Sequence, residues 1–460
     1  MNVSDHAALA HAVGGRWLQV PPPADAVTSV TIDSRDVTRG ALFAALRGTR
    51  VDGHAYLADA ADLGAAAVMV ESAAPIDHTS LACGVLEVDD VRRALGALGA
   101  WYRRQLAVTL VVGITGSCGK TTTRRLLHGV LATAMTGTSA ERSFNNDLGV
   151  PLTLCRAQRD DDYLLVEIGT NAPGEIGHLT DLAQPTVGIL TGIAEAHLEG
   201  FGTVDRIIEE KTALLRGLAP DGVAIVFDDP RLDAACATLP EVIRYGERPG
   251  STIRLTHWDA RSRQLEVDGS AQFTLGVPGR HNAMNALAAI AAGRRFGLTD
   301  QQIATGLESV APDGMRLSPI DRDGITFIND AYNANPASMR AGLATFAELS
   351  TDATRRILVL GDMLELGEAA PALHEALGTE LASLDQRLPI DHVVYVGQYG
   401  DDVRSGARQL AARIEVVAPQ DATQIDRVRR GFRVGDAVFV KGSRGLALER
   451  IIEPPCSTTC

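Results

Sequence analysis

The sequence predicts an α/β protein of three domains: a small N-terminal α/β domain, a central domain with a doubly wound, mostly parallel sheet, and a C-terminal parallel-sheet domain. At 460 residues the chain is too long for one ordinary core, and its 45% hydrophobic content is enough for several. From about residue 108 onward, apolar runs of strand length alternate with helical patterns, as in parallel sheets. We therefore expect domains at residues 1–106, 107–313 and 314–460.

In the N-terminal domain, two apolar runs at residues 27–32 and 65–70 predict strands. The first strand leads into Asp33, Ser34 and Arg35. A hydroxyl and a guanidinium in one turn can bind a phosphate or the edge of a base. The same three residues also form ordinary solvated turns, so the motif alone leaves both interpretations open.

The central domain opens with a strand that leads into a glycine-rich turn and then a helix. The strands expected here are residues 108–114, 163–168, 186–193 and 222–227. The turn that would bind phosphate consists of Gly116, Ser117, Cys118, Gly119, Lys120, Thr121 and Thr122. Lys120 would reach the β- and γ-phosphates of a nucleotide, and the Thr121 hydroxyl would ligate Mg²⁺. The pattern indicates a P-loop-type nucleoside triphosphate site, although Ile114 replaces one glycine of the strict motif.

Polar residues follow two other strands of this predicted sheet. Glu167 ends the strand over 163–168, and His197 follows the strand over 186–193. Ligand groups collect at the carboxyl ends of parallel strands, and a carboxylate and an imidazole can both bind a metal. The alternative for Glu167 is a solvated loop acid.

Lys211 lies on the apolar face of a helix expected over residues 204–218. A lysine in that position usually extends its ammonium to solvent or pairs with an acid, since unpaired burial is costly. Burial also lowers the pKa of an amine, and a neutral amine can take up CO₂ to form a carbamate that binds Mg²⁺. From the residues alone, the solvent-reaching lysine is the favoured interpretation.

A helix beginning after Gly279 places Asn282 in its first turn, where it could bind a base edge or stabilise the helix end. The C-terminal domain then repeats the strand–helix alternation, which predicts a Rossmann-like sheet with strands at residues 325–329, 357–360, 393–396 and 437–440. Asp330 and the segment 441–444 follow two of these strands.

Composition excludes several classes of function. The net charge of −14 argues against nucleic-acid binding that depends on overall charge. The six cysteines include no C-x-x-C pair and indicate reduced thiols. The first residues lack a basic segment, and the longest apolar stretches, such as residues 63–70, are too short to span a bilayer. We expect a cytoplasmic protein without stable membrane insertion.

With these motifs assembled, the chain resembles the Mur ligases of peptidoglycan synthesis, in the branch that joins D-alanyl-D-alanine to a UDP-muramoyl tripeptide. The segments that carry the resemblance are 33–35, 40–48, 116–123, 143–146, 149–153, 167–176, 196–202, 279–282, 330–339, 361–367 and 441–445. The segment from Asp330 to Met339, which contains Tyr-Asn-Ala-Asn-Pro, is the strongest discriminator within the family. Cys118, Ile168 and Thr170 depart modestly from the family pattern.

The resemblance implies a ligase that uses ATP and two Mg²⁺ ions and forms an acyl phosphate, acting as a monomer on the two substrates just named. It implies ATP binding by residues 116–122, Asn282 at the adenine, Arg316 at a phosphate and Asp330 at the ribose. The implied metal ligands are Thr121, Glu167, His197 and a carbamylated Lys211. The implied catalytic residues are Lys120, His197, Lys211 and Asn146, with Asn145 as the alternative to Asn146. The resemblance also implies UDP-substrate contacts at Ser34 and Arg35, and acceptor contacts at Tyr332, Asn333, Asn335 and Ser443.

Two alternatives are less well supported by the sequence. A related ligase that adds an amino acid to a muramoyl peptide, or glutamate to folate, would share the central domain but not the 33–35 or 330–339 segments. A P-loop ATPase that drives a partner protein would hydrolyse ATP without a carboxylate substrate.

Overall fold

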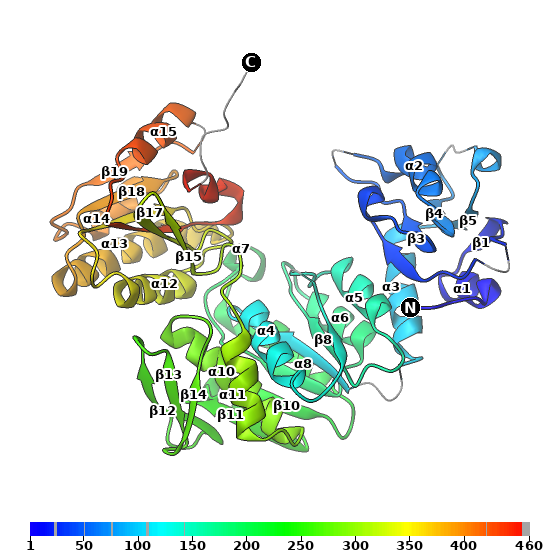
Figure 1. Cartoon of the computed structure of the whole chain (residues 1–460), viewed down its shortest axis with the longest axis horizontal. Coiled ribbons are helices and arrows are strands. Elements are labelled where there is room, and N and C mark those ends of the chain that lie inside the picture. Colours follow the sequence, from blue (N-terminus) through cyan, green and yellow to red (C-terminus); the bar gives the residue numbers. More distant parts are fainter. Residues whose placement is uncertain are drawn as a thin grey trace. The chain divides into compact units, whose positions relative to one another are not determined.

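The computed structural model describes residues 1–22, 25–49, 51–74, 77–106, 110–141, 143–419 and 421–452. These residues form three sheet-containing regions (Figure 1). By packing, the chain divides into two compact units. One consists of residues 1–115, 131–190 and 210–243, and the other of residues 116–130, 191–209 and 244–460.

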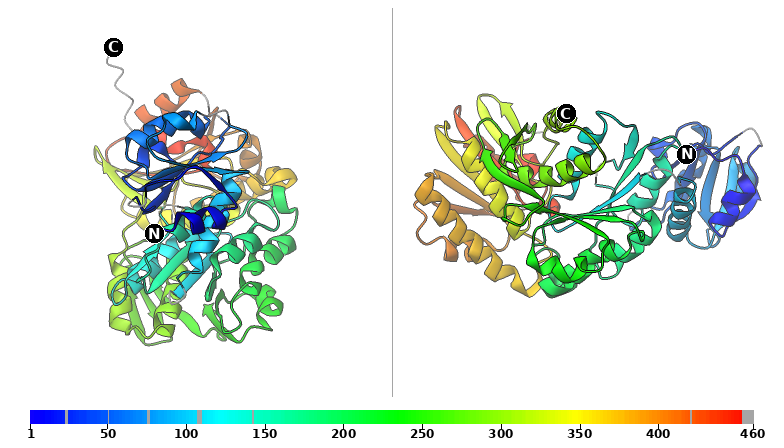
Figure 2. Two further views of the ribbon diagram at one scale, coloured as in Figure 1. Left: turned by 90° about the vertical axis from the view of Figure 1, so that its right-hand side faces the viewer. Right: turned by 90° about the horizontal axis from the view of Figure 1, so that it is seen from below.

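The N-terminal sheet has five strands in the order β1-β5-β4-β3-β2, parallel except for β1. The strands are β1 (Arg16–Gln19), β2 (Ser29–Thr31), β3 (Ala41–Ala44), β4 (Ala67–Glu71) and β5 (Gly84–Val88). Alternate residues face opposite sides, because successive side chains of a strand point to opposite faces. Leu42 and Met69 pack toward α1 (His6–Ala12) and α3 (Val91–Arg103), whereas Phe43 and Val68 pack toward α2 (Leu57–Asp62). Figures 1 and 2 show helices on both faces of this sheet.

The central sheet has the strand order β14-β13-β12-β11-β10-β9-β6-β8-β7. Its parallel strands are β6 (Leu110–Thr115), β7 (Gly137–Ser139), β8 (Tyr163–Glu167), β9 (Val187–Leu190) and β10 (Val223–Phe227), with β11 (Glu241–Gly246) parallel to β12 (Ile253–Asp259). The helices in this part of the chain are α4 (Lys120–Leu131), α5 (Gly149–Arg156), α6 (Glu175–Ala183), α7 (Leu198–Phe201), α8 (Val204–Arg216), α9 (Asp233–Cys236), α10 (Arg280–Arg295) and α11 (Asp300–Ser309). Strands β8 and β9 are buried along their whole length, as expected of a sheet covered on both faces.

The sequence reasoning missed an antiparallel extension at one edge of this sheet. Strand β12 pairs with β13 (Gln264–Val267), which pairs with β14 (Ala271–Thr274). In β13 buried residues alternate with more exposed ones, and an Asp268–Gly269 pair turns the chain into β14. That alternation with an Asp-Gly turn is the usual signal of a hairpin and was available in the sequence.

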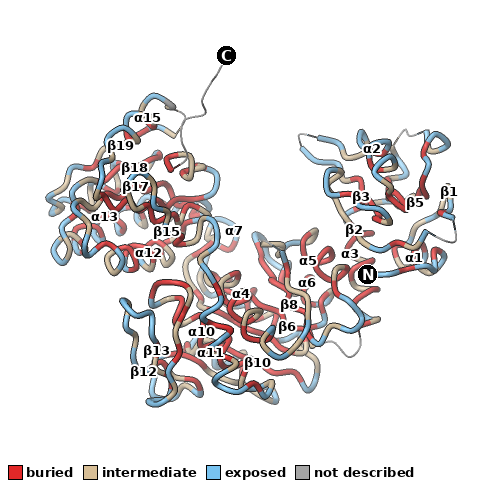
Figure 3. Tube along the Cα trace, in the orientation of Figure 1, coloured by how far each residue is buried: buried red, intermediate tan, exposed pale blue. Residues whose placement is uncertain are grey.

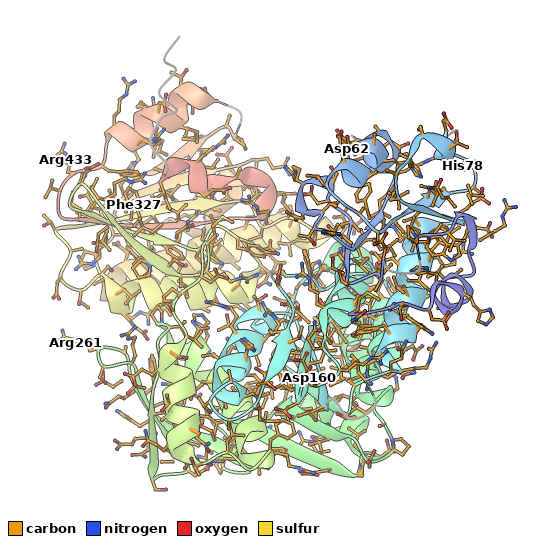
Figure 4. The ribbon with its side chains drawn as sticks, turned by 45° about the vertical axis from the view of Figure 1, so that its right-hand side comes forward. Asp62, His78, Asp160, Arg261, Phe327 and Arg433 are labelled. Carbon is orange, nitrogen blue, oxygen red and sulfur yellow. The ribbon has the colours of Figure 1, made fainter. Side chains whose placement is uncertain are left out.

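The C-terminal sheet has the order β15-β16-β20-β17-β18-β19, with β15 antiparallel at the edge. The strands are β15 (Ser318–Arg322), β16 (Ile325–Asn329), β17 (Arg355–Gly361), β18 (His392–Val396), β19 (Ile414–Val417) and β20 (Asp436–Lys441); the helices are α12 (Pro336–Leu349), α13 (Ala370–Arg387), α14 (Gly400–Gly406) and α15 (Ala422–Arg430). Leu358 and Phe439 face α12 and α13, and Val359 faces the opposite core with Phe327. Figure 3 shows the buried parts of the chain, and Figure 4 labels Phe327.

The predicted fold class is confirmed, with small corrections at element ends. The strand expected over 186–193 ends at Leu190, because residues 192 and 194 form hydrogen bonds with Ser117 instead of continuing the sheet. The strand expected from residue 108 begins at Leu110, and residues 108 and 109 lie outside the described residues, as do Cys456 and Cys460. The other four cysteines form no disulfide. Among the described residues, no helix has the length and hydropathy needed to cross a membrane.

Candidate active site

The glycine-rich turn between β6 and α4 requires glycine at two positions. Gly116 has φ +149°, and a Cβ there would lie 1.8 Å from Oγ1 of Thr191. Gly119 has φ +86°, and a Cβ there would lie 2.3 Å from Oδ1 of Asn285. Helix α4 begins at the next residue, Lys120. The turn therefore brings backbone N–H groups to a helix N-terminus, which is the arrangement that binds phosphate.

The strict P-loop pattern requires glycine at position 114, where this chain has Ile114. The residue lies inside β6 and is fully buried, paired in register with Glu167 of β8 and Ile189 of β9. The position is therefore part of the sheet, and the turn starts two residues later at Gly116. Lys120 spans the turn, since its Nζ donates to the carbonyl oxygen of Gly116 at 2.9 Å.

Residues 191–194, which follow β9, form hydrogen bonds with this turn. Ser117 donates its N–H to the oxygen of Gly192 at 2.9 Å, and its hydroxyl exchanges hydrogen bonds with the backbone of Ala194 at 3.0 Å. Oγ1 of Thr191 donates to the oxygen of Cys118 at 2.5 Å. With these contacts, the conformation of the turn is fixed before any ligand binds.

Glu167 ends β8 and is 1% exposed. Asn145 donates from Nδ2 to Oε1 of Glu167 at 3.0 Å, and its Cγ lies 2.8 Å from the position that a Cβ on Gly169 would take. The solvated-acid alternative is wrong, because the carboxylate is buried. The neighbouring Asn146 uses its Oδ1 to accept the N–H of Gly149 at 2.9 Å, at the start of α5. The structure thus places Asn145, and not Asn146, against the carboxylate.

His197 has a left-handed backbone, with φ 57°, immediately before α7. Its Nδ1 pairs with the carboxylate of Glu365, a residue in the loop after β17. That hydrogen bond lowers the pKa of Glu365 below its usual range. Histidines that bind metals commonly give their other ring N–H to a carboxylate, so Nε2 is the nitrogen available here for a metal.

Lys211 lies on α8 and is 2% exposed, one of the largest fully buried side chains in the protein. Its position on the apolar face is confirmed. The solvent-reaching alternative is wrong, because almost none of the residue is exposed. An internally paired lysine and a carbamate are the two states that fit this burial.

The donor types present suit Mg²⁺, which prefers oxygen ligands. Thr121, which is 5% exposed, offers a hydroxyl in the first turn of α4, and Glu167 offers a carboxylate fixed by Asn145. Among the residues that the structure describes, no three His, Cys, Asp or Glu side chains gather as a metal cluster. The expected ligand set does not need one, since it includes a threonine and a lysine.

The expected nucleotide contacts are buried or packed within the second unit. Asn282 donates from Nδ2 to the oxygen of Pro278 at 2.7 Å, and its Oδ1 accepts from Asn285, the residue that fills the space beside Gly119. Asp330 accepts from Nζ of Lys441 at 2.6 Å and from the N–H of Leu317 at 3.2 Å.

Burial raises the pKa of Asp330, and the nearby Lys441 charge opposes that rise. Lys441 is itself 2% exposed and was not among the expected site residues. The guanidinium of Arg316 lies over the ring of Tyr332, 3.9 Å from its centre.

The expected acceptor residues differ in exposure. Asn335 stabilises the start of α12 by accepting the N–H of Ser338 at 2.8 Å, and its Nδ2 lies 3.2 Å from Sγ of Cys118. Ser443 is buried and accepts the N–H of Leu364 at 2.9 Å. Asn333 is exposed, and Tyr332 is half-buried under Arg316.

In the N-terminal region, Ser34 and Arg35 belong to a short 3₁₀ turn over Ser34–Asp36. Arg35 chelates Asp33 through Nε and Nη2, at 2.8 and 2.5 Å, while its side chain is 85% exposed. That hydrogen bonding raises the pKa of Arg35 further above its already high value. The exposed guanidinium remains accessible to an anionic ligand.

Comparison with known proteins covers almost the whole chain. Three family models match: "Mur ligase family, catalytic domain" at residues 26–103, "Mur ligase middle domain" at 114–293 and "Mur ligase, glutamate ligase domain" at 315–444. A Bacillus subtilis protein named UDP-N-acetylmuramoyl-tripeptide–D-alanyl-D-alanine ligase is 34% identical over 431 residues, covering 93% of each chain. The chain belongs to the Mur ligase family.

Other relatives of this Mur ligase carry the same name. The Escherichia coli protein is 32% identical over 92% of each chain. The crystal structure of MurF from Acinetobacter baumannii superposes with a TM-score of 0.84 at 31% identity, covering 98% of each chain. A MurF ligase from Thermotoga maritima, solved in complex with ADP, has a TM-score of 0.74 at 25% identity over 93% of this chain and 96% of its own.

Proposed function

We propose that this Mur ligase joins D-alanyl-D-alanine to UDP-N-acetylmuramoyl-tripeptide in the cytoplasm, using ATP. The observation that carries the proposal is the 34% identity to a ligase of that name over 93% of both chains. The fixed phosphate-binding turn and the segment from Asp330 to Met339 support the same reaction. The products are UDP-N-acetylmuramoyl-pentapeptide, ADP and phosphate.

The chemistry requires activation of a carboxylate, which is a poor electrophile. A carboxylate oxygen of the tripeptide attacks the γ-phosphorus of ATP, the bond to ADP breaks, and an acyl phosphate forms. The amine of D-alanyl-D-alanine attacks the acyl carbon, phosphate leaves and the amine loses a proton. Two anions meet in the first step, so cationic groups and dipoles must offset their repulsion.

The chain offers such groups at the phosphate-binding turn. We assign Lys120 and residues 116–122 to the phosphates, with the N-terminus of α4 adding positive potential. We assign Thr121 and Glu167 to one Mg²⁺, and His197 with carbamylated Lys211 to a second; when bound, the ions offset negative charge on the phosphates. Asn145 orients Glu167, and Asn146 is assigned to the acyl group.

The remaining assignments divide the substrates among the three expected domains. Residues 1–106, through Ser34 and Arg35, take the UDP-linked substrate; residues 107–313 take ATP; and residues 314–460 take the dipeptide. Asn282 faces adenine, Asp330 the ribose and Arg316 a phosphate. A carboxylate has about four lone-pair sites, so Asp330 can accept ribose hydroxyls while it holds Lys441. Tyr332, Asn333, Asn335 and Ser443 are assigned to the acceptor side.

The test is a reaction with the full chain in which one component is omitted at a time. Phosphate release should require ATP, Mg²⁺, the UDP-muramoyl tripeptide and D-alanyl-D-alanine together, and mass spectrometry should find the pentapeptide. Lys120→Met is the negative control, because it removes the cation at the phosphates. Equal turnover with free D-alanine, or turnover without any peptide, would refute the proposal.

A further inference from the structure

Glu210, the residue before Lys211 on α8, is a buried carboxylate with two short hydrogen bonds to backbone. Its Oε2 accepts the N–H of Gly174 at 2.7 Å, and its Oε1 accepts the N–H of Ile176 at 2.7 Å. Glu210 is 7% exposed. Hydrogen bonds to an ionised carboxylate are the stronger class, and both of these act at the start of α6.

Helix α6 needs this external partner because of the residue that precedes it. Gly174 precedes the helix with φ 88° and has no side chain with which to accept the N–H groups of the first turn. Glu210 supplies the missing acceptor from another helix. Losing the carboxylate would therefore leave two N–H groups without their acceptor at the junction of α6 and α8.

The rest of α8 packs closely on the same region. A Cβ on Gly217, the residue after α8, would lie 2.5 Å from Thr180 of α6, and a Cβ on Gly113 of β6 would lie 2.8 Å from Leu214 of α8. Glu210 holds the middle of α8, and these apolar contacts hold its C-terminal end. Successive helical residues point about 100° apart, so Glu210 can face α6 while Lys211 is buried in another direction.

The start of α6 is connected to Glu167 by a short loop that has its own hydrogen bonds. Oε2 of Glu175 accepts the N–H of Asn171 at 2.7 Å and the hydroxyl of Thr170 at 3.1 Å. Gly169 donates its N–H to the oxygen of Asn145 at 2.7 Å, and Asn145 holds Glu167. Hydrogen bonds and the short backbone segment of this loop thus link α8 to the carboxylate of Glu167.

We propose that Glu210 is a positioning residue: it holds α8 to the start of α6 so that Lys211 and Glu167 keep a fixed separation for metal binding. The inference rests on the proposed function, which assigns both residues to Mg²⁺. Groups that hold metal ligands in place typically change metal affinity or activity about 10- to 100-fold when they are replaced.

The test compares Glu210→Gln and Glu210→Ala with Glu209→Gln, an exposed carboxylate one residue away on the same helix. Binding of Mn²⁺ to the full chain in the presence of ADP is measured by electron paramagnetic resonance, alongside thermal unfolding and amide hydrogen exchange of residues 170–176. We expect both Glu210 variants to bind Mn²⁺ about 10-fold more weakly, with faster exchange at 174 and 176, at temperatures where they are folded. Glu209→Gln should match the unchanged enzyme.

Glu210→Gln keeps one acceptor oxygen, so it decides the question if Glu210→Ala does not fold. A folded Glu210→Gln protein with lower thermal stability but unchanged Mn²⁺ affinity would overturn the proposal and leave Glu210 a purely structural residue. Failure of the unchanged enzyme to make the pentapeptide would instead refute the proposed function, and the Mn²⁺ measurement would still decide the role of Glu210.

Discussion

Two candidate metal ligands of this Mur ligase are oriented in different ways. Glu167 is 1% exposed and is held by Asn145, 22 residues before it in the sequence. The side chain of His197 is 21% exposed and is held by Glu365, 168 residues after it. The first ligand is oriented by its own sheet region, whereas the second depends on a loop of the C-terminal sheet. Disturbing one region should therefore affect the two ligands unequally.

Replacing Lys211 should have the largest effect on activity, because Lys211 is itself an assigned metal ligand. It lies in the same buried region as Glu167. Lys211→Arg should lower kcat by about 100-fold or more, since a guanidinium stays protonated and cannot form a carbamate. Lys211→Ala should be equally inactive but recover part of its rate in an acetate or formate series, as a small carboxylate fills the space. Steady-state phosphate release measures both.

An internally paired cationic lysine makes the opposite prediction for these variants. Arginine would then preserve much of the activity, and added carboxylates would not rescue alanine. An active Lys211→Arg enzyme would end the carbamate assignment.

Asn145→Ala tests the local side of the comparison. Removing the Nδ2 donor leaves Glu167 buried without that hydrogen bond. We therefore expect the Mg²⁺ concentration that gives half-maximal activity to rise about 10-fold. Asn146→Ala differs from Asn145→Ala: it should leave that Mg²⁺ dependence unchanged, lower thermal stability by weakening the start of α5, where its Oδ1 accepts, and lower kcat through loss of its assigned contact with the acyl group. Equal Mg²⁺ dependence in Asn145→Ala and the unchanged enzyme would show that Asn145 does not orient the carboxylate.

Glu365→Gln tests the orientation of His197 by the C-terminal loop and should have a smaller effect. The Mg²⁺ concentration that gives half-maximal activity should rise about 3- to 10-fold. A glutamine oxygen can still accept the histidine N–H, but the charge that strengthens the pair is lost. Glu368→Gln, in the same loop and exposed, is the control. The comparison fails if Glu365→Gln is more damaging than Asn145→Ala.

His374 links pH to stability on the C-terminal side. It is fully buried, its Nδ1 donates to the oxygen of Ala370 at 2.6 Å, and its Nε2 accepts the N–H of Met363, two residues before Glu365. Burial lowers the pKa of His374 below its ordinary value of 6.5.

The unfolded chain therefore binds a proton at a higher pH than the folded chain does. The free energy of unfolding should be insensitive to His374 above pH 6.5 and should fall below it, by up to about 1.4 kcal/mol per pH unit until the lowered pKa is reached. Denaturant unfolding between pH 5 and 8 measures this slope, and His374→Gln should make it shallower. An unchanged slope in that variant would exclude His374 as its source.

Cys118 gives the smallest expected effect. The thiol contacts Asn335 but has no part in the proposed reaction, so Cys118→Ser should retain activity within about twofold and lose sensitivity to thiol alkylation. Activity assays before and after treatment with an alkylating reagent test this. An inactive but folded Cys118→Ser protein would show that the phosphate-binding turn has a different geometry from the one described.

Much of the fold was predictable because parallel strands and their helices leave local patterns. The apolar runs around Val112, Leu165 and Ile189, and the turn after Thr115, all carry such signals. Lys211 was identifiable as unusual from helical spacing alone. The partners that orient the ligands were not predictable in this way, because Glu365 and Glu210 are ordinary acids in sequence and become distinctive only when folding brings a histidine or a helix start against them.

The contact between Gly119 and Asn285 constrains how this enzyme can change over evolutionary time. Asn285 occupies the space that a side chain at residue 119 would need, 2.3 Å from the position of its Cβ. A side chain at 119 is therefore tolerable only after Asn285 has become smaller, and it would still carry the cost of φ +86°. Shrinking Asn285 first removes its hydrogen bond to Asn282. Each single change is therefore harmful, and the double change still carries the backbone cost at 119 and the lost hydrogen bond, so we expect both positions to stay fixed.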